Sequence, residues 1–237
     1  MDLKYLRAIT FNRSRFIIIF LIITLHLFQS GFAQVAVGLF GAFDNSQYSG
    51  DVPRDIDYVF TKGYALGLCF DKSLQERTFI SVRPNYTVGG TEIKLRSNSN
   101  LLLPAIKTGT DPDSLFLSPI TNKYLALPIL TQIYVRRGFY ANCGLDVSYI
   151  LDAHAEGPFE SIDIIDHINQ LSIKAVFGFG FSVPVRSTSF NIEATYSQGL
   201  NTLTKTDEIE KGLLPRLRTN RLRLAAYFII FTSKEKL

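Results

Sequence analysis

The residues that could carry acid–base chemistry are few. Outside the first 33 residues the sequence has two histidines, His154 and His167, and His167 stands near Asp163 and Asp166. An imidazole held by a carboxylate can serve as a general base or as a metal ligand. Because both histidines fall in a predicted loop, we favour the simpler interpretation that they are solvated loop residues.

The other groups of residues that could bind a metal or carry out catalysis give a weaker signal. Asp111 and Asp113 could offer carboxylates to Ca²⁺, but the dense oxygen-ligand spacing of a calcium loop is missing. Cys69 and Cys143 have no Cys or His at metal-ligand spacing, and we expect both to be unpaired. The sequence contains no nucleophile elbow, phosphate loop or zinc-helix motif. It therefore predicts no enzyme, no metal site and no cofactor.

The N-terminal segment has the composition of an export signal. Four basic residues and a single acidic one, Asp2, precede the apolar run Phe16–Phe28. As a helix, about 13 residues span roughly 20 Å, less than the roughly 30 Å of a bilayer core. Small residues at Gly31 and Ala33 then fit a cleavage site. We predict a signal peptide over residues 1–33 and one domain over residues 34–237; an uncleaved signal-anchor is the alternative.

The charge of the remaining chain is almost balanced. The signal holds four of the 25 basic and one of the 21 acidic residues, which leaves 21 and 20. With no net positive charge and no Lys/Arg stripe, nucleic-acid binding is not expected. After the signal no apolar stretch approaches 18 residues, so we expect no membrane-spanning helix.

Alternation of apolar and polar residues with period two dominates from Gln34 onward and is typical of barrel strands. It is clearest in Phe139–Leu151, Leu171–Val183 and Phe190–Ser197. Five further segments fit less cleanly, namely Val35–Phe43, Lys62–Phe70, Thr78–Val88, Lys123–Arg136 and Arg221–Phe231. Within them Pro84 and Pro128 predict bulges or strand ends, because proline has no ladder donor.

The connections between these segments alternate strictly in length. Long ones (44–61, 89–122, 152–170, 199–220) alternate with short ones (71–77, 136–138, 184–189). A membrane barrel with both termini in the periplasm has long external loops and short internal turns. The sequence thus predicts an all-β fold: one antiparallel up-and-down transmembrane barrel of eight strands.

The two faces of the strands differ in side-chain size, and this difference predicts which face lies inside. An eight-stranded barrel has a lumen just wide enough for side chains, so the bulky apolar face must point outward to lipid. We expect lipid-facing positions at Leu145, Val147, Phe177, Phe179, Phe181 and Ile192. The polar face predicts a paired lumen network of Arg83, Asp146, Lys174, Glu193, Arg221 and Arg223. We favour a plug of mutually paired charges, since unpaired buried ions are costly; a gated or selective pore is the alternative.

Aromatic residues near the strand ends could form the girdles that mark membrane interfaces, or could simply favour strand formation. The candidates are Tyr124, Tyr134, Tyr140, Tyr149, Tyr196 and Phe231.

Several segments resemble a known family. The signal ending at Ala33-Gln34 and the strands Lys123–Leu130, Gly138–Leu145 and Leu222–Phe228 resemble the PorT-like, or porin-like, outer-membrane β-barrels common in Bacteroidetes. The resemblance implies an eight-stranded barrel in the outer membrane, usually without known activity. Some members resemble components of a protein-secretion route. It supplies no catalytic or ligand residue.

Taken with the residues, this resemblance predicts a non-enzymatic integral protein of the cell outer membrane, with a structural, recognition or secretion-accessory role through long external loops. Its expected partners are outer-membrane lipid and envelope or secretion proteins, and it is expected to be a monomer. A narrow pore for ions or small solutes is the first alternative. A small membrane-embedded barrel enzyme and a soluble lipid-binding barrel of the periplasm are others.

Overall fold

The structure is a computed structural model that describes residues 35–51, 56–95, 117–136, 138–156, 161–185, 188–205 and 216–230. The predicted signal peptide and the Asp111–Asp113 pair lie outside these residues, so both remain predictions. Within the described ranges, no helix has the length and apolar character needed to cross a bilayer.

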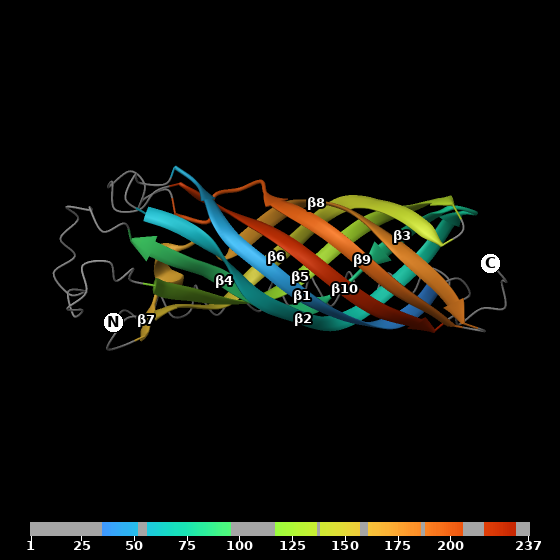
Figure 1. Ribbon diagram of the computed structural model, residues 1–237, viewed down its shortest axis with the longest axis horizontal. Coiled ribbons are helices and arrows are strands. Elements are labelled where there is room, and N and C mark those ends of the chain that lie inside the picture. Colours follow the sequence, from blue (N-terminus) through green and yellow to red (C-terminus); the bar gives the residue numbers. More distant parts are fainter. Residues whose placement is uncertain are drawn as a thin grey trace, which may run out of the picture.

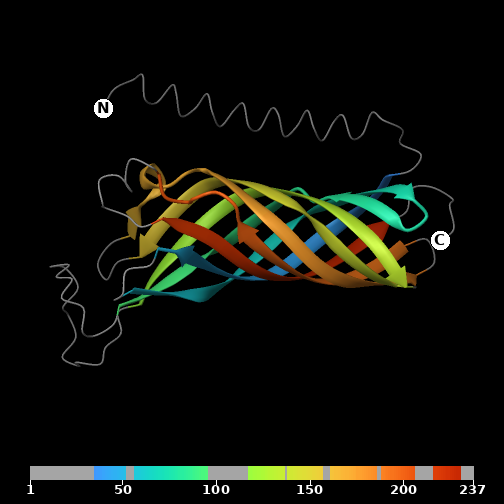
Figure 2. The same ribbon diagram turned by 90° about the horizontal axis from the view of Figure 1, so that it is seen from above.

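The described residues form ten strands and one short 3₁₀ helix, and the strands run obliquely around a cylinder (Figures 1 and 2). The elements are β1 (Val35–Gly50), β2 (Ile56–Gln75), β3 (Thr78–Val82), β4 (Asn85–Leu95), β5 (Leu117–Arg136), β6 (Phe139–Glu156), β7 (Ser161–Asp163), η2 (Ile165–His167), β8 (Leu171–Val185), β9 (Thr188–Gly199) and β10 (Leu217–Ile230).

The sheet closes on itself, so the wall of the cylinder has no free edge. Each strand pairs antiparallel with its neighbour in the order β1, β2, β3/β4, β5, β6, β8, β9, β10, and β10 returns to β1 with Val37 opposite Ile230. Because β3 and β4 are two parts of one interrupted strand, the ring has eight strands. The predicted eight-stranded up-and-down barrel is confirmed, and β7 is a short addition beside the end of β6.

The two prolines have different effects on the wall. Pro84 separates β3 from β4, whereas Pro128 lies inside an uninterrupted β5. The backbone amide of Arg83 donates to the Pro128 carbonyl at 3.0 Å. In an antiparallel strand the amide and the carbonyl of one residue face the same neighbouring strand, so the nitrogen of Pro128, which carries no hydrogen, also faces Arg83–Pro84. The break between β3 and β4 therefore lies opposite the position where β5 cannot donate a hydrogen bond.

The strands are longer than the sequence pattern predicts at the end with the long connections, which we call the loop side; the opposite end is the turn side. β1 continues to Gly50 and β2 begins at Ile56, so most of the predicted 44–61 loop is strand. β5 has 20 residues, about twice the 9–11 that a tilted strand needs to cross a bilayer. The wall consequently extends beyond the membrane on the loop side.

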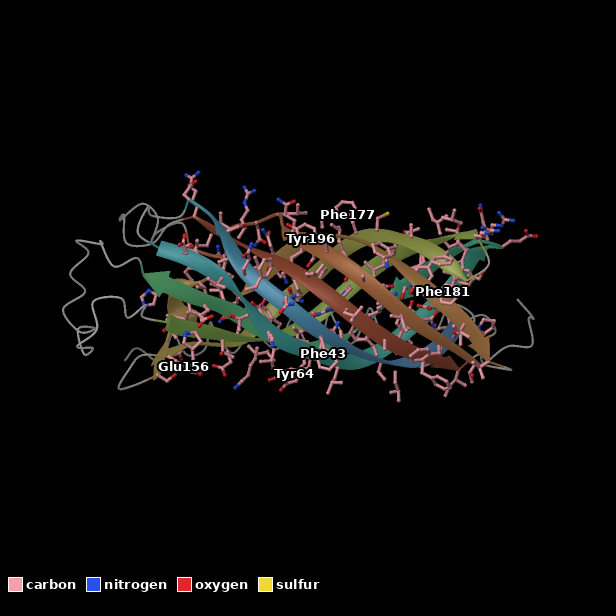
Figure 3. All side chains as sticks on the ribbon, in the orientation of Figure 1. Phe43, Tyr64, Glu156, Phe177, Phe181 and Tyr196 are labelled. Atoms are coloured by element: carbon pink, nitrogen blue, oxygen red, sulfur yellow. The ribbon has the colours of Figure 1, made fainter. Side chains whose placement is uncertain are left out.

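The outward face of the wall is apolar over its central part. Side chains project outward all along the barrel (Figure 3), and Phe43, Tyr64, Phe177, Phe181 and Tyr196 are all exposed. The two cysteines lie on opposite faces of the wall: Cys69 is buried inside and Cys143 is exposed outside. Both are free, as predicted.

Candidate functional site

The structure places all six residues of the predicted lumen network inside the barrel. Each is at most 7% exposed: Arg83, Asp146, Lys174, Glu193, Arg221 and Arg223. The six residues predicted to face lipid lie on the outer side; five are at least 40% exposed, and Val147 is partly exposed. All six take part in ion pairs: Arg83 with Glu193, and Asp146 with both Lys174 and Arg221. Arg221 and Arg223 also lie beside Asp44, a further carboxylate of the lumen.

Arg83 and Glu193 connect opposite walls of the barrel. Arg83 lies between β3 and β4, and Glu193 lies on β9, four positions away around the ring of eight. Nη1 and Nη2 of Arg83 donate to the two carboxylate oxygens at 2.6 and 2.9 Å. The Tyr140 hydroxyl also donates to Glu193, at 3.1 Å, and lies 2.6 Å from the Tyr227 hydroxyl. This bidentate pair therefore crosses the full width of the lumen.

A second charged layer lies nearer the loop side. Both oxygens of Asp44 accept hydrogen bonds from Arg223, at 2.7 and 2.8 Å. Asp146 lies 3.7 Å from Lys174 Nζ and 3.7 Å from Arg221 Nη1. Lys174 donates to Ser148 Oγ at 2.7 Å. This layer contains three cations and two carboxylates.

Apolar and aromatic side chains pack across the lumen at both ends of these charges. The turn-side cluster consists of Phe40, Ala42, Ala65, Cys69, Tyr140, Ala225, Tyr227 and Ile229. The loop-side cluster consists of Tyr48, Ile120, Tyr124, Ile150, Ala153, Ile168, Leu203 and Leu217. Every member is at most 8% exposed. A buried charged layer enclosed by two packed clusters has the form of a plug.

Three of the six girdle candidates are buried: Tyr124, Tyr140 and Tyr149 are 1%, 2% and 6% exposed. Tyr124 and Tyr140 belong to the two clusters inside the barrel, and the partly buried Tyr134 packs against the turn-side cluster. Their hydroxyls have partners there: Tyr124 accepts from Asn122, and Tyr140 contacts Glu193. A tyrosine has an apolar ring and a polar hydroxyl, so it suits a polar interior as well as a membrane interface, and residue type alone did not distinguish the two. Tyr196 is exposed on the outer face, and Phe231 lies outside the described residues.

Two acidic residues of the lumen were missed by the sequence analysis. Asp44 and Asp71 are 3% and 7% exposed, yet each was placed at the start of a connection. Asp71 accepts from the Cys69 thiol at 3.2 Å. The signal was present in the sequence, because Phe40, Ala42 and Asp44 continue one parity and so face the same side of the strand.

The two histidines lie on different elements, His154 on β6 and His167 in η2. His154 Nε2 lies 2.6 Å from Asp152 Oδ1 on the outer surface, where Asp152 also accepts from Lys123. Asp163 accepts from the backbone amide of Ile165 at 2.9 Å. Among the described residues, no group of three or more His, Cys, Asp or Glu side chains could hold a metal ion.

A comparison with protein families decides the class of this barrel. Residues 29–205 match the family described as "outer membrane protein beta-barrel domain". The chain belongs to this family. The outer membrane barrel is accordingly located in the outer membrane of the cell, with its apolar outer face in the lipid.

Several solved outer-membrane barrels are similar in structure to this outer membrane barrel. Ail, the attachment invasion locus protein of Yersinia pestis, is 13% identical, with a TM-score of 0.45 and coverage of 83% of this chain and 99% of Ail. Neisserial surface protein A is 8% identical (TM-score 0.47; 82% and 97% covered). OprG from Pseudomonas aeruginosa is 12% identical (TM-score 0.45; 84% and 96% covered). No curated protein matches the sequence.

Proposed function

We propose that this outer membrane barrel is a closed, non-enzymatic envelope protein that acts in recognition through its loop-side end and does not conduct solutes through its lumen. The observation that carries the proposal is the Arg83–Glu193 pair, which joins opposite walls between two packed clusters. A solute would have to break a bidentate, buried ion pair to pass. The alternative, a narrow pore, requires the Arg83–Glu193 pair to separate.

The loop side offers an ordered surface for such recognition. Asn169 Nδ2 donates to the carbonyls of Thr202 and Thr204, both at 3.0 Å, and so ties two connections together. The amide of Leu203 donates to the Leu217 carbonyl at 2.6 Å. A surface that is already held in place loses little conformational entropy when it binds a partner.

The expected partners follow from the placement of the chain. Outer-membrane lipid surrounds the apolar wall, and envelope or secretion proteins are the candidates for the loop side. The barrel is expected to act as a monomer and not to bind nucleic acid. Membership of the PorT-like branch is part of the proposal; it is supported by the strand segments Lys123–Leu130 and Gly138–Leu145.

Single-channel recording in planar bilayers tests the closed lumen. The wild-type barrel should give no steady conductance steps. The double variant Arg83→Ala/Glu193→Ala removes the crossing pair and leaves both packed clusters in place, so conductance in this variant alone would identify the pair as the element that closes the lumen. Steady conductance of the wild type that persists over repeated preparations would overturn the proposal in favour of the narrow pore.

A further inference from the structure

Arg221 occupies an unusual position in the charged layer of the lumen. Its side chain is 1% exposed, yet Nε, Nη1 and Nη2 have no hydrogen-bond acceptor among the described residues. Its nearest carboxylate oxygens, on Asp44 and Asp146, lie 3.6 and 3.7 Å away. Buried polar groups in native proteins almost always have a partner, and a guanidinium offers five donors.

The carboxylates around Arg221 are largely committed to other cations. Both oxygens of Asp44 already accept from Arg223. Asp146 is then shared between Arg221 and Lys174, which both lie 3.7 Å from the same oxygen, Oδ2. The layer therefore has one positive charge more than its carboxylates balance, in an interior where an unbalanced charge is costly.

A small cavity adjoins Arg221, and its lining suits an anion. It has room for about one water-sized particle. Arg221 and Arg223 contribute guanidinium groups, and Thr195 and Ser197 lie on the same wall with hydroxyls. Two carboxylates also line it. Glu193 accepts from Arg83 with both oxygens. Asp146 has Oδ2 beside Lys174 and Arg221, and its Oδ1 has no hydrogen-bond partner among the described residues.

We propose that this cavity is a binding site for a small monovalent anion of the halide type, held by Arg221 with Arg223, Thr195 and Ser197. One such ion supplies the acceptor that Arg221 lacks and balances the charge of the layer. The site lies between the two packed clusters, so the ion enters while the barrel folds. The proposal does not depend on whether the lumen conducts.

Bromide, whose anomalous X-ray scattering identifies it, tests the site. The full barrel is folded into detergent micelles in sodium bromide and crystallised. We expect one anomalous peak within hydrogen-bond distance of the Arg221 guanidinium. Peaks confined to surface cations, or a water at Arg221 without anomalous signal, would overturn the proposal, and this result needs no variant.

A matched pair of variants gives a second readout. Arg221→Gln should lose the internal peak, and its unfolding temperature should no longer be higher in bromide than in gluconate at equal ionic strength. Arg218→Gln is the control, because Arg218 lies on the same strand but is exposed outside; it should keep both properties. An internal peak that survives in Arg221→Gln would contradict the assignment to Arg221.

Discussion

At the scale of single residues, burial decides how much an ion pair matters to stability. Replacement of Glu193 by Gln leaves the Arg83 guanidinium charged in a dry lumen without its carboxylate. We expect a loss of about 3–5 kcal/mol in the free energy of unfolding, measured by urea titration in lipid vesicles. Lys123→Gln is the control: it breaks the Lys123–Asp152 pair, which is exposed on the outer wall, and should leave stability unchanged within error.

The cause of this loss can be separated from loss of packing. The double variant Arg83→Met/Glu193→Leu removes both charges at similar volume and should recover most of the stability, because the cost arises from the uncompensated ion. A double variant as unstable as Glu193→Gln would show that the pair contributes mainly through its geometry.

Sequence patterns could identify the charged residues of the lumen but not their partners. The parity of the strands placed Arg83 and Glu193 on the inner face, and the structure places them there too. Their pairing depends on the number of strands in the ring and on the stagger of each strand, which bring residues 110 positions apart together. Tyr124 and Tyr140 were candidates for the interface girdles because an amphipathic ring fits both environments.

At the scale of the strands, the distance to the neighbouring backbone decides whether a glycine can be replaced. Gly144 lies too close to its neighbour to carry a side chain, whereas Gly41 has room for one. A Cβ on Gly144 would lie 2.0 Å from the Ile129 carbonyl oxygen of the neighbouring strand, and backbone atoms cannot move aside alone. Gly144→Ala should therefore force β5 and β6 apart at a cost of about 1–3 kcal/mol. A Cβ on Gly41 meets only Leu66 Cδ2, at 3.7 Å, so Gly41→Ala is the matched control.

Folding assays report this difference directly. Folded barrels resist SDS until heated and migrate differently on unheated gels, so the folded fraction can be read from band intensities. Gly41→Ala should match the wild type, whereas Gly144→Ala should show a smaller folded fraction at a given urea concentration. Equal fractions for the two variants would mean that β5 and β6 can relax around the added methyl.

Strand identity was predictable from alternation, whereas strand ends were not. All eight segments expected to cross the membrane do so, but Asp44 to Gly50 was taken as loop because Asp, Asn and Ser are common in turns. Hydrogen bonding to an adjacent long strand overrides that preference: Asp44 through Gly50 pair with Leu217 through Arg223 on β10. Such pairing depends on the partner strand, which local sequence does not contain.

At the scale of the whole molecule, the barrel has two unequal ends whose sides of the membrane can be determined. The start of β1 and the end of β10 lie at the turn side, the end of the barrel that also holds the turn between β2 and β3 (Figures 1 and 2). In outer-membrane barrels short turns face the periplasm. We therefore expect the loop side to face the cell exterior.

A membrane-impermeant maleimide applied to intact cells tests this orientation. In a Cys143→Ala background, Asp51→Cys places a thiol on an exposed loop-side residue and Glu76→Cys places one on an exposed turn-side residue. Cys69 is fully buried and should not react. Label should reach residue 51 in intact cells and residue 76 only after the outer membrane is disrupted. The reverse pattern would place the tied loops of residues 161–170 and 200–205 in the periplasm, where they could meet only periplasmic partners, and the proposal of recognition at the cell surface would fail while the closed lumen remained intact.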